Sequence, residues 1–156
     1  MIYADVGSLA AMENFGCEMY FATEAGLSDT VFLLWSTTPT VMLGKYQNAL
    51  EEIDRTYVEE HGITVIRRMS GGGTIYTDPG GLQFSYIVPD KSQTIDFSAF
   101  GTPVTRALCD LGLDAAADGR NDILVSGKKV SGNAQYKIKG ATVHHGSLLF
   151  DTDLAA

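Results

Sequence analysis

The sequence predicts an α+β fold, in which a mostly antiparallel, mixed β-sheet is flanked by helices and residues 1–156 form one domain. Three observations favour this class. Two longer segments have the apolar spacing of helices, whereas the other apolar runs are short and alternate or are rich in β-branched residues. Turns of Gly, Pro, Asp or Lys join the later runs directly. No repeat, linker or low-complexity tract divides the chain.

In the first half of the chain, capping and turn residues separate the predicted elements. Ser8 caps a predicted helix that runs to about Ala25. Its apolar face, at i, i+3 and i+4 spacing, consists of Met12, Phe15, Met19 and Ala22. Because Gly16 and Cys17 are small, we expect another element to pack closely there. Predicted strands follow over Thr30–Trp35, Thr40–Leu43 and Ile63–Ile66, with a short helix over Ile53–Glu60.

The second half of the chain contains one helix among several strands. Strands are predicted over Thr74–Tyr76 and Leu82–Val88, and a helix over Asp96–Leu111 is ended by Gly112. Short Gly or Lys turns then separate further predicted strands over Ile123–Val125, Lys129–Ser131, Ala134–Ile138 and Thr142–Phe150.

Composition limits the class of protein. The chain is 45% hydrophobic and 19% charged, which is typical of a soluble domain, and no apolar run reaches the ~18 residues of a membrane span. The N-terminus has no basic region of a secretory signal, and two cysteines form no disulfide framework, so we expect a cytoplasmic protein. The net charge of −8 argues against nucleic acid as a partner. Basic residues gather between 120 and 139, which suits a small anion.

The segment from Arg67 to Asp78 reads RRMSGGGTIYTD and joins two predicted strands. Three consecutive glycines allow either a tight hairpin turn or the close approach of a ligand to bare N–H groups. Because Arg67 and Arg68 stand beside them, and guanidinium groups bind phosphate and carboxylate, we interpret the segment as an anion site for a nucleotide. The segment matches neither G-x-x-x-x-G-K-[ST] nor G-x-G-x-x-G.

A second candidate stretch runs from Gly119 to Gly132. Lys129 places a cation beside the small residues of Val130-Ser131-Gly132, although a Ser-Gly-Lys-Lys turn is also common at solvent-facing hairpins. Asp122 is either a Mg²⁺ ligand or a turn residue. His144 and His145 are adjacent in a predicted strand and point to opposite faces, so a shared zinc site is not expected.

These stretches together resemble the N-terminal part of the lipoate–protein ligase family. The matching residues run in order along the chain: Asn14-Phe15-Gly16-Cys17-Glu18, Phe32-Leu33-Leu34-Trp35, Gly44-Lys45-Tyr46-Gln47-Asn48, Arg67 to Gly73, Arg120-Asn121-Asp122, Lys129-Val130-Ser131-Gly132 and His144-His145-Gly146-Ser147. The resemblance implies a biotin/lipoate protein ligase-like catalytic domain that is C-terminally incomplete at Ala156. A sheet cut after its last predicted strand would expose that strand as an unpaired edge.

The resemblance also implies a reaction. Lipoate, the substrate, would be activated by ATP with Mg²⁺ to lipoyl-adenylate, and the lipoyl group would pass to a lysine of an E2 lipoyl domain of a 2-oxoacid dehydrogenase or of the glycine cleavage H protein. Lys129 would be catalytic. The nucleotide would be bound by Arg68, Gly71, Gly72, Gly73, Thr74, Ile75, Tyr76, Asp122 and Lys129, with Asp122 also holding the metal. Lipoate would be bound by Ser70, Gly71, Gly72, Lys129 and His145.

Two residues depart from the family pattern. Thr77 stands where the family often has His, and Met19 stands where a second Glu often follows Glu18. An octanoyl or lipoyl transferase of the same fold is the nearest alternative, but its cysteine nucleophile is absent from the segment Ala117–Asp122. Cys17 and Cys109 are instead interpreted as small core residues. A non-catalytic lipoyl- or biotin-binding fragment is the other alternative.

Overall fold

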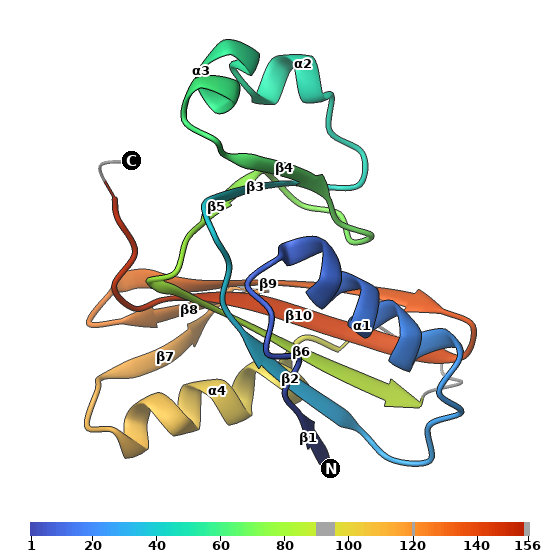
Figure 1. The fold of residues 1–156 in the computed structure, drawn as a ribbon. Helices are drawn as coiled ribbons and strands as arrows, with labels where there is room; N and C mark the ends of the chain where they lie inside the picture. The colour runs from blue at the N-terminus through green and yellow to red at the C-terminus, as the bar shows by residue number, and fades with distance from the viewer. Residues whose placement is uncertain (90–95, 120, 155–156) are drawn as a thin grey trace.

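The structure, a computed structural model, describes residues 1–89, 96–119 and 121–154 and contains two β-sheets (Figure 1). The large sheet has the strand order β1 (Ile2–Ala4), β2 (Val31–Trp35), β6 (Gly81–Pro89), β10 (Ala141–Leu149), β9 (Lys128–Ile138), β8 (Asp122–Val125) and β7 (Ala115–Asp118). The small sheet has the order β4 (Thr64–Arg67), β3 (Thr40–Leu43) and β5 (Ile75–Thr77). The pairs β1–β2 and β3–β4 are parallel and the others are antiparallel, so the predicted mixed α+β fold is confirmed.

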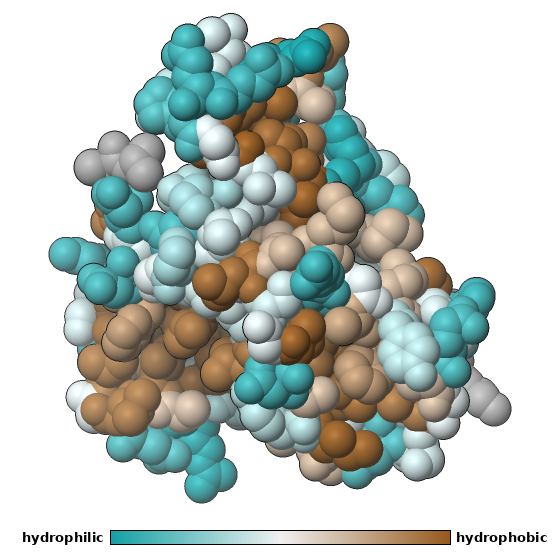
Figure 2. Space-filling model, viewed as in Figure 1, coloured by the Kyte–Doolittle hydropathy of each residue, from teal (hydrophilic) through white to brown (hydrophobic). Residues whose placement is uncertain are grey.

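Helices cover the large sheet on both faces. Helix α1 (Ala11–Thr23) packs on β2, β6 and β10, whereas α4 (Ser98–Asp110) packs near β7 on the other face, where Phe100 stacks on His144. The short helices α2 (Ala49–Glu52) and α3 (Arg55–Glu60) connect β3 to β4 and have no buried residues. Figure 2 shows this α2–α3 lobe covered by hydrophilic side chains. Within the described residues, no helix has the length and apolar character needed to cross a membrane.

One hydrophobic core connects the two sheets. Val31, Leu33 and Trp35 of β2 pack with Ile87 and Val143 of the large sheet. The core also includes Ala11 and Ala22 of α1 and Met42 and Ile66 of the small sheet. Because the small sheet shares apolar contacts with the large one, the two sheets are held at a fixed separation around the site.

Helix α1 differs from its prediction in both start and orientation. Its first helical residue is Ala11, and the hydroxyl of Ser8 lies before the helix, where it accepts from the N–H of Ala10 and donates to Glu13. The buried face consists of Ala11, Asn14, Glu18 and Ala22, whereas Met12 is 71% exposed. Hydrophobic spacing failed here because the two central buried positions carry polar side chains. A Cβ added at Gly16 would meet no neighbour within 4 Å, so the close packing expected there is absent.

Several other expectations need correction. β4 and β5 both pair with β3, so the glycine segment between them is a crossover loop, which excludes the alternative of a tight hairpin turn. The last strand, β10, lies between β6 and β9 and is not an edge. The cysteines are not core residues, because Cys17 is half-buried and Cys109 is exposed. The short elements β1, β7 and α2 were not predicted, and the two strands predicted at 129–131 and 134–138 are one strand, β9.

A β-bulge interrupts the pairing of β8 with β9. Asp122 pairs with Gly132 and Ile123 with Ser131, but Leu124 pairs with Lys129, so Val130 is the extra residue. Strict alternation from Gly132 would put Lys129 on the α4 face of the sheet. The bulge instead places Lys129 on the face of Gly132 and Asp122, because directly opposed residues share a face. A Cβ placed on Gly132 would accordingly lie 3.7 Å from Lys129 Nζ.

Candidate functional site

A cavity of about 530 Å³ lies between the two sheets. Its walls include residues of α1, β2, β3, the glycine loop (residues 71–74), β5, β6, β9 and β10. One part of the lining is apolar and consists of Phe15, Trp35, Met42 and Ile75. The ring centroids of Phe15 and Trp35 lie 5.2 Å apart in an edge-on arrangement. Lys129, Arg68 and the glycines form the polar part. The cavity therefore suits a molecule with an apolar tail and an anionic head.

Arg68 holds the backbone of the glycine loop through hydrogen bonds. Its Nε donates to Ser70 Oγ at 3.2 Å and its Nη1 donates to Met42 O at 2.8 Å. Its Nη2 donates to Gly71 O at 3.1 Å and to Gly73 O at 2.6 Å. Burial lowers the pKa of this guanidinium, which the surrounding carbonyl groups compensate by accepting its hydrogen bonds. Arg68 lines the cavity, yet each of its nitrogens already serves the protein.

With the loop carbonyls turned toward Arg68, the loop N–H groups remain unused. Among the described residues, none accepts a hydrogen bond from the N–H of Gly71, Gly72 or Gly73. Gly72 has φ +100°, a backbone conformation that residues other than glycine rarely adopt. Gly73 does not have a positive φ. Free N–H groups beside a cavity are suited to an anion such as phosphate.

A neighbouring loop supports the glycine loop through its backbone. A Cβ at Gly44 would collide with the carbonyl oxygen of Gly72, so only glycine fits at position 44. Arg67 Nη1 donates to Gly44 O at 2.8 Å and to Gln47 O at 2.7 Å. Gln47 Oε1 accepts from Gly44 N and from Thr74 Oγ1, both at 2.8 Å. The two predicted anion-binding arginines thus have structural partners. Gln47, which the resemblance included without a role, supports the loop through its side chain.

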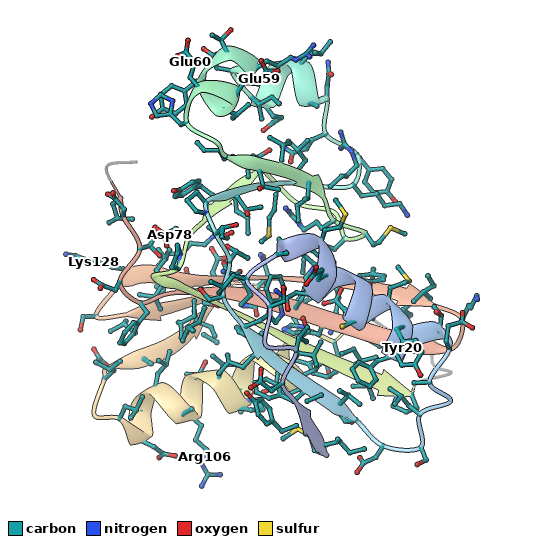
Figure 3. The ribbon with its side chains drawn as sticks, in the orientation of Figure 1. Tyr20, Glu59, Glu60, Asp78, Arg106 and Lys128 are labelled. Atoms are coloured by element: carbon teal, nitrogen blue, oxygen red, sulfur yellow. The ribbon has the colours of Figure 1, made fainter. Side chains whose placement is uncertain are left out.

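Lys129 is the cation that reaches the cavity from the large sheet. Its Nζ lies 2.9 Å from Asp122 Oδ2, and its side chain is 57% exposed. The other carboxylate oxygen, Asp122 Oδ1, is buried and has no hydrogen-bond partner within the described structure. Lys128 does not line the cavity, and Figure 3 shows its side chain pointing out from the start of β9 into solvent. Lys129 thus lines the cavity, whereas its neighbour Lys128 does not.

His145 connects the apolar part of the cavity to buried polar groups. Its Nε2 lies 2.6 Å from Ser70 Oγ, and its Nδ1 lies 3.1 Å from Glu18 Oε2. Glu18 also accepts from Ser85 Oγ at 2.6 Å and from Tyr136 OH at 3.0 Å. Burial alone would raise the pKa of Glu18, but His145 and these hydrogen bonds outweigh it and lower the pKa. Burial, followed by the charge of Glu18, raises the pKa of Tyr136.

Although a Ser–His–Glu series resembles a hydrolytic triad, its geometry excludes that use here. Ser70 is 1% exposed, does not line the cavity, and accepts a hydrogen bond from Arg68 that reduces its nucleophilicity. His144, on the opposite face, contacts Gln135 and Asn133 through its ring nitrogens. The two adjacent histidines thus point apart as predicted, and the described residues contain no cluster of three or more His, Cys, Asp or Glu able to hold a metal.

Most of the predicted site residues meet at this cavity. Those that line it are Arg68, Gly71, Gly72, Gly73, Thr74, Ile75, Tyr76, Lys129 and His145. Ser70 lies one hydrogen bond behind the wall, and Asp122 contacts the cavity through Lys129. Thr77, where the family often has His, is buried and its hydroxyl pairs with Thr37 at 2.8 Å. Phe15, Trp35, Gln83 and Asn133 also line the cavity and carried no sequence prediction of a site role.

Comparison with known proteins assigns the family. A model of the lipoyl protein ligase A/B catalytic domain matches residues 10–156. The lipoate–protein ligase LplJ of Bacillus subtilis is 44% identical over 140 residues, which cover 89% of this chain and 42% of the relative. Lipoate–protein ligase 1 of Staphylococcus aureus is 40% identical over 142 residues, which cover 90% of this chain and 43% of the relative. The chain thus spans less than half the length of these curated relatives.

Solved structures agree with this assignment. A lipoate protein ligase from Thermoplasma acidophilum with bound lipoic acid superimposes with a TM-score of 0.83 at 29% identity, covering 98% of this chain and 68% of that one. A lipoate–protein ligase A bound with ATP gives 0.79 at 29% identity, covering 99% and 66%. The fold, the glycine loop, the cavity and these matches lead to one conclusion: the chain belongs to the lipoyl protein ligase A/B catalytic domain family.

Proposed function

We propose that this protein activates lipoate with ATP and transfers the lipoyl group to a lysine of an acceptor protein. The observation that carries the proposal is one cavity with two unlike parts. The apolar part is lined by Phe15, Trp35 and Met42, and the polar part combines the free N–H groups of the glycine loop with the ammonium of Lys129. An acyl chain with a carboxylate fits the first part, and a phosphate fits the second.

The proposed chemistry requires two anions to meet. A carboxylate oxygen of lipoate attacks the α-phosphorus of ATP, the bond from that phosphorus to the bridging oxygen breaks, and pyrophosphate leaves. An acceptor lysine then attacks the acyl carbon of lipoyl-adenylate and AMP leaves. Lys129 and the loop N–H groups would offset the repulsion between carboxylate and phosphate and hold both in reacting position.

The named ligands of related proteins support the substrates. One related structure contains lipoic acid and another contains ATP, and a third is that of a two-part ligase and its E2 lipoyl domain from Thermoplasma acidophilum. We therefore propose lipoate and ATP as substrates and an E2 lipoyl domain as acceptor, with the glycine cleavage H protein as a second acceptor, all in the cytoplasm.

Asp122 fits a magnesium ion that enters with the nucleotide. Mg²⁺ usually takes one or two carboxylates together with phosphate oxygens and water, and it would supply charge neutralisation at the phosphates. The accessible oxygen of Asp122 is the one that Lys129 contacts, because the other is buried. A metal at Asp122 would thus compete with Lys129 for that oxygen and free the ammonium for the ligands. An ion pair as exposed as this one contributes only about 0–1 kcal/mol, so the exchange is easy.

Lipoate-dependent exchange between pyrophosphate and ATP, measured on the full-length protein, tests the proposal. Loss of one preorganised donor costs about 10²–10³ in rate, so Lys129→Ala should reduce exchange by that order with little change in melting temperature. Lys128→Ala is the matched control and should stay within a few-fold of wild type. If both variants behave alike, the role of Lys129 is wrong.

The same assay separates the alternatives. A thioester-dependent transferase would transfer the acyl group without ATP and would need a cysteine at the cavity. Neither Cys17 nor Cys109 lines the cavity, and Cys109 Sγ contacts Ala115 O instead. A non-catalytic binding protein would bind lipoate but show no exchange.

A further inference from the structure

A buried chain of hydrogen bonds connects helix α1 to the glycine loop. It runs from Glu18 through His145 and Ser70 to Arg68, whose Nη2 holds the carbonyls of Gly71 and Gly73. The side chains of this relay (Glu18, His145, Ser70 and Arg68) are between 1% and 7% exposed. Because these side chains are almost entirely screened from water, each bond constrains the next one.

One direction of the hydrogen bonds gives every donor in the relay an acceptor. Arg68 Nε can only donate, so Ser70 Oγ accepts from it and has its own proton left to donate. The carboxylate of Glu18 can only accept, so His145 Nδ1 carries a proton. Ser70 then donates to His145 Nε2, which is the unprotonated nitrogen of a neutral ring. With this assignment every donor in the relay has an acceptor.

The ends of the relay carry opposite charges. Arg68 is a buried cation and Glu18 a buried anion, and the oriented hydroxyl of Ser70 and the ring of His145 lie between them. A buried charge is stable only when partners compensate it. Removing the acceptor at Glu18 would free His145 to rotate or change tautomer, which would leave Ser70, and through it Arg68 Nε, without a fixed partner.

We propose that Glu18 is a positioning residue for the glycine loop. From helix α1 it fixes the tautomer of His145, and through Ser70 it sets the direction of the Arg68 guanidinium. That guanidinium turns the loop carbonyls inward and the loop N–H groups toward the ligand. The consequence for ligands rests on the proposed function, because that function assigns the loop to ATP. The effect on the conformation of the loop does not depend on the proposed function.

Two variants at one position separate hydrogen bonding from bulk. Glu18→Leu keeps a similar volume but has no acceptor, whereas Glu18→Gln keeps an oxygen that can accept from His145. In ¹⁵N NMR spectra of the ligand-free protein, Glu18→Leu should shift the amide signals of Gly71, Gly72 and Gly73 and the ring nitrogens of His145. Glu18→Gln should restore both sets. ATP affinity by calorimetry, with MgCl₂ present, should fall at least tenfold in Glu18→Leu and recover in Glu18→Gln.

Controls exclude a general loss of stability. Asn14→Leu removes another fully buried polar side chain from the same helix, whose amide contacts Ser8 O and not the relay. It should lower the melting temperature without moving the loop signals. Ser70→Ala cuts the relay by removing only a hydroxyl and serves if Glu18→Leu does not fold. Unshifted Gly71–Gly73 signals in folded Ser70→Ala or Glu18→Leu, or equal shifts in Asn14→Leu, would overturn the inference. Failure of wild type to bind ATP would count against the proposed function alone.

Discussion

At the scale of single residues, the hydrogen-bond partners of a charged group decide what it can do for a ligand. The sequence suggests that Arg67 and Arg68 bind an anion, yet their guanidinium nitrogens donate to backbone carbonyls of two loops and of strand β3. Under the proposed function, the donors to the ligand are the loop N–H groups and Lys129, which belong to residues that line the cavity. The arginines therefore act one layer away, by fixing the backbone that presents those groups.

Two adjacent glycines should respond differently to substitution. Gly72 has φ +100°, and a Cβ there would lie 3.0 Å from Arg68 Nη2, so Gly72→Ala should destabilise the fold by about 1–3 kcal/mol. A Cβ at Gly73 meets nothing within 4 Å, so Gly73→Val should leave the melting temperature nearly unchanged while its side chain blocks ATP. Thermal melting and calorimetric titration of both variants check this. Wild-type ATP affinity in Gly73→Val would argue that the loop is not the nucleotide site.

His144 should make stability depend on pH. Burial, and then the proximity of His145, lowers the pKa of His144 from 6.5 to about 4. Between these values the unfolded chain binds a proton that the folded protein does not, so the free energy of unfolding should fall as pH falls from 6.5 to 4, by at most roughly 3 kcal/mol. Urea unfolding across this range should show a smaller slope for His144→Gln. His61→Gln, at an exposed position, is the control and should retain the wild-type slope.

At the scale of elements, close contacts between strands are set by residues without side chains. A Cβ at Gly146 of β10 would collide with Asn133 Oδ1 of β9 and with the ring of Phe84 of β6. Overpacking of this kind costs about 1–3 kcal/mol, so Gly146→Ala should lower the free energy of unfolding by that amount. Gly101→Ala in α4 has open space and should instead raise it by about 0.5–1 kcal/mol, because alanine favours a helix. Chemical denaturation of the two variants should give opposite signs.

The same elements show what the sequence could and could not predict. Most strands and both long helices lie near their predicted positions, although α1 begins later and buries a different face, and most of the site residues given by the glycine motif and the resemblance line the cavity. Glu18 was not identified as a site residue because hydrophobic spacing selects apolar residues, and its partners Ser85, Tyr136 and His145 are distant in sequence. The bulge at Val130 could not be predicted, because the alternation of side chains between the two faces assumes a regular strand. The edge strands β1 and β7 are short and largely exposed, so no burial pattern marks them.

At the scale of the whole molecule, stability should be unequal between the two sheets. β6 and β10 are paired on both sides within the large sheet, whereas α2 and α3 have no buried residues above a three-stranded sheet. Native-state hydrogen exchange should therefore be slowest in β6 and β10 and fastest in the α2–α3 lobe. Uniform exchange across both sheets would mean that they unfold as one unit. A ligand that contacts both sheets should reduce the difference in exchange rate between them, because its binding free energy is lost when either sheet opens.

The contact between Gly44 and Gly72 limits how this site can be engineered. Because any side chain at position 44 collides with the Gly72 carbonyl, the glycine loop is shaped by a strand end that lies far from it in the chain. Transferring the sequence RRMSGGG alone to another protein would leave out Gly44, whose backbone packs against the carbonyl of Gly72. A portable version of the binding loop must carry the segment Gly44 to Gln47 with it, as two pieces of chain held at a fixed spacing.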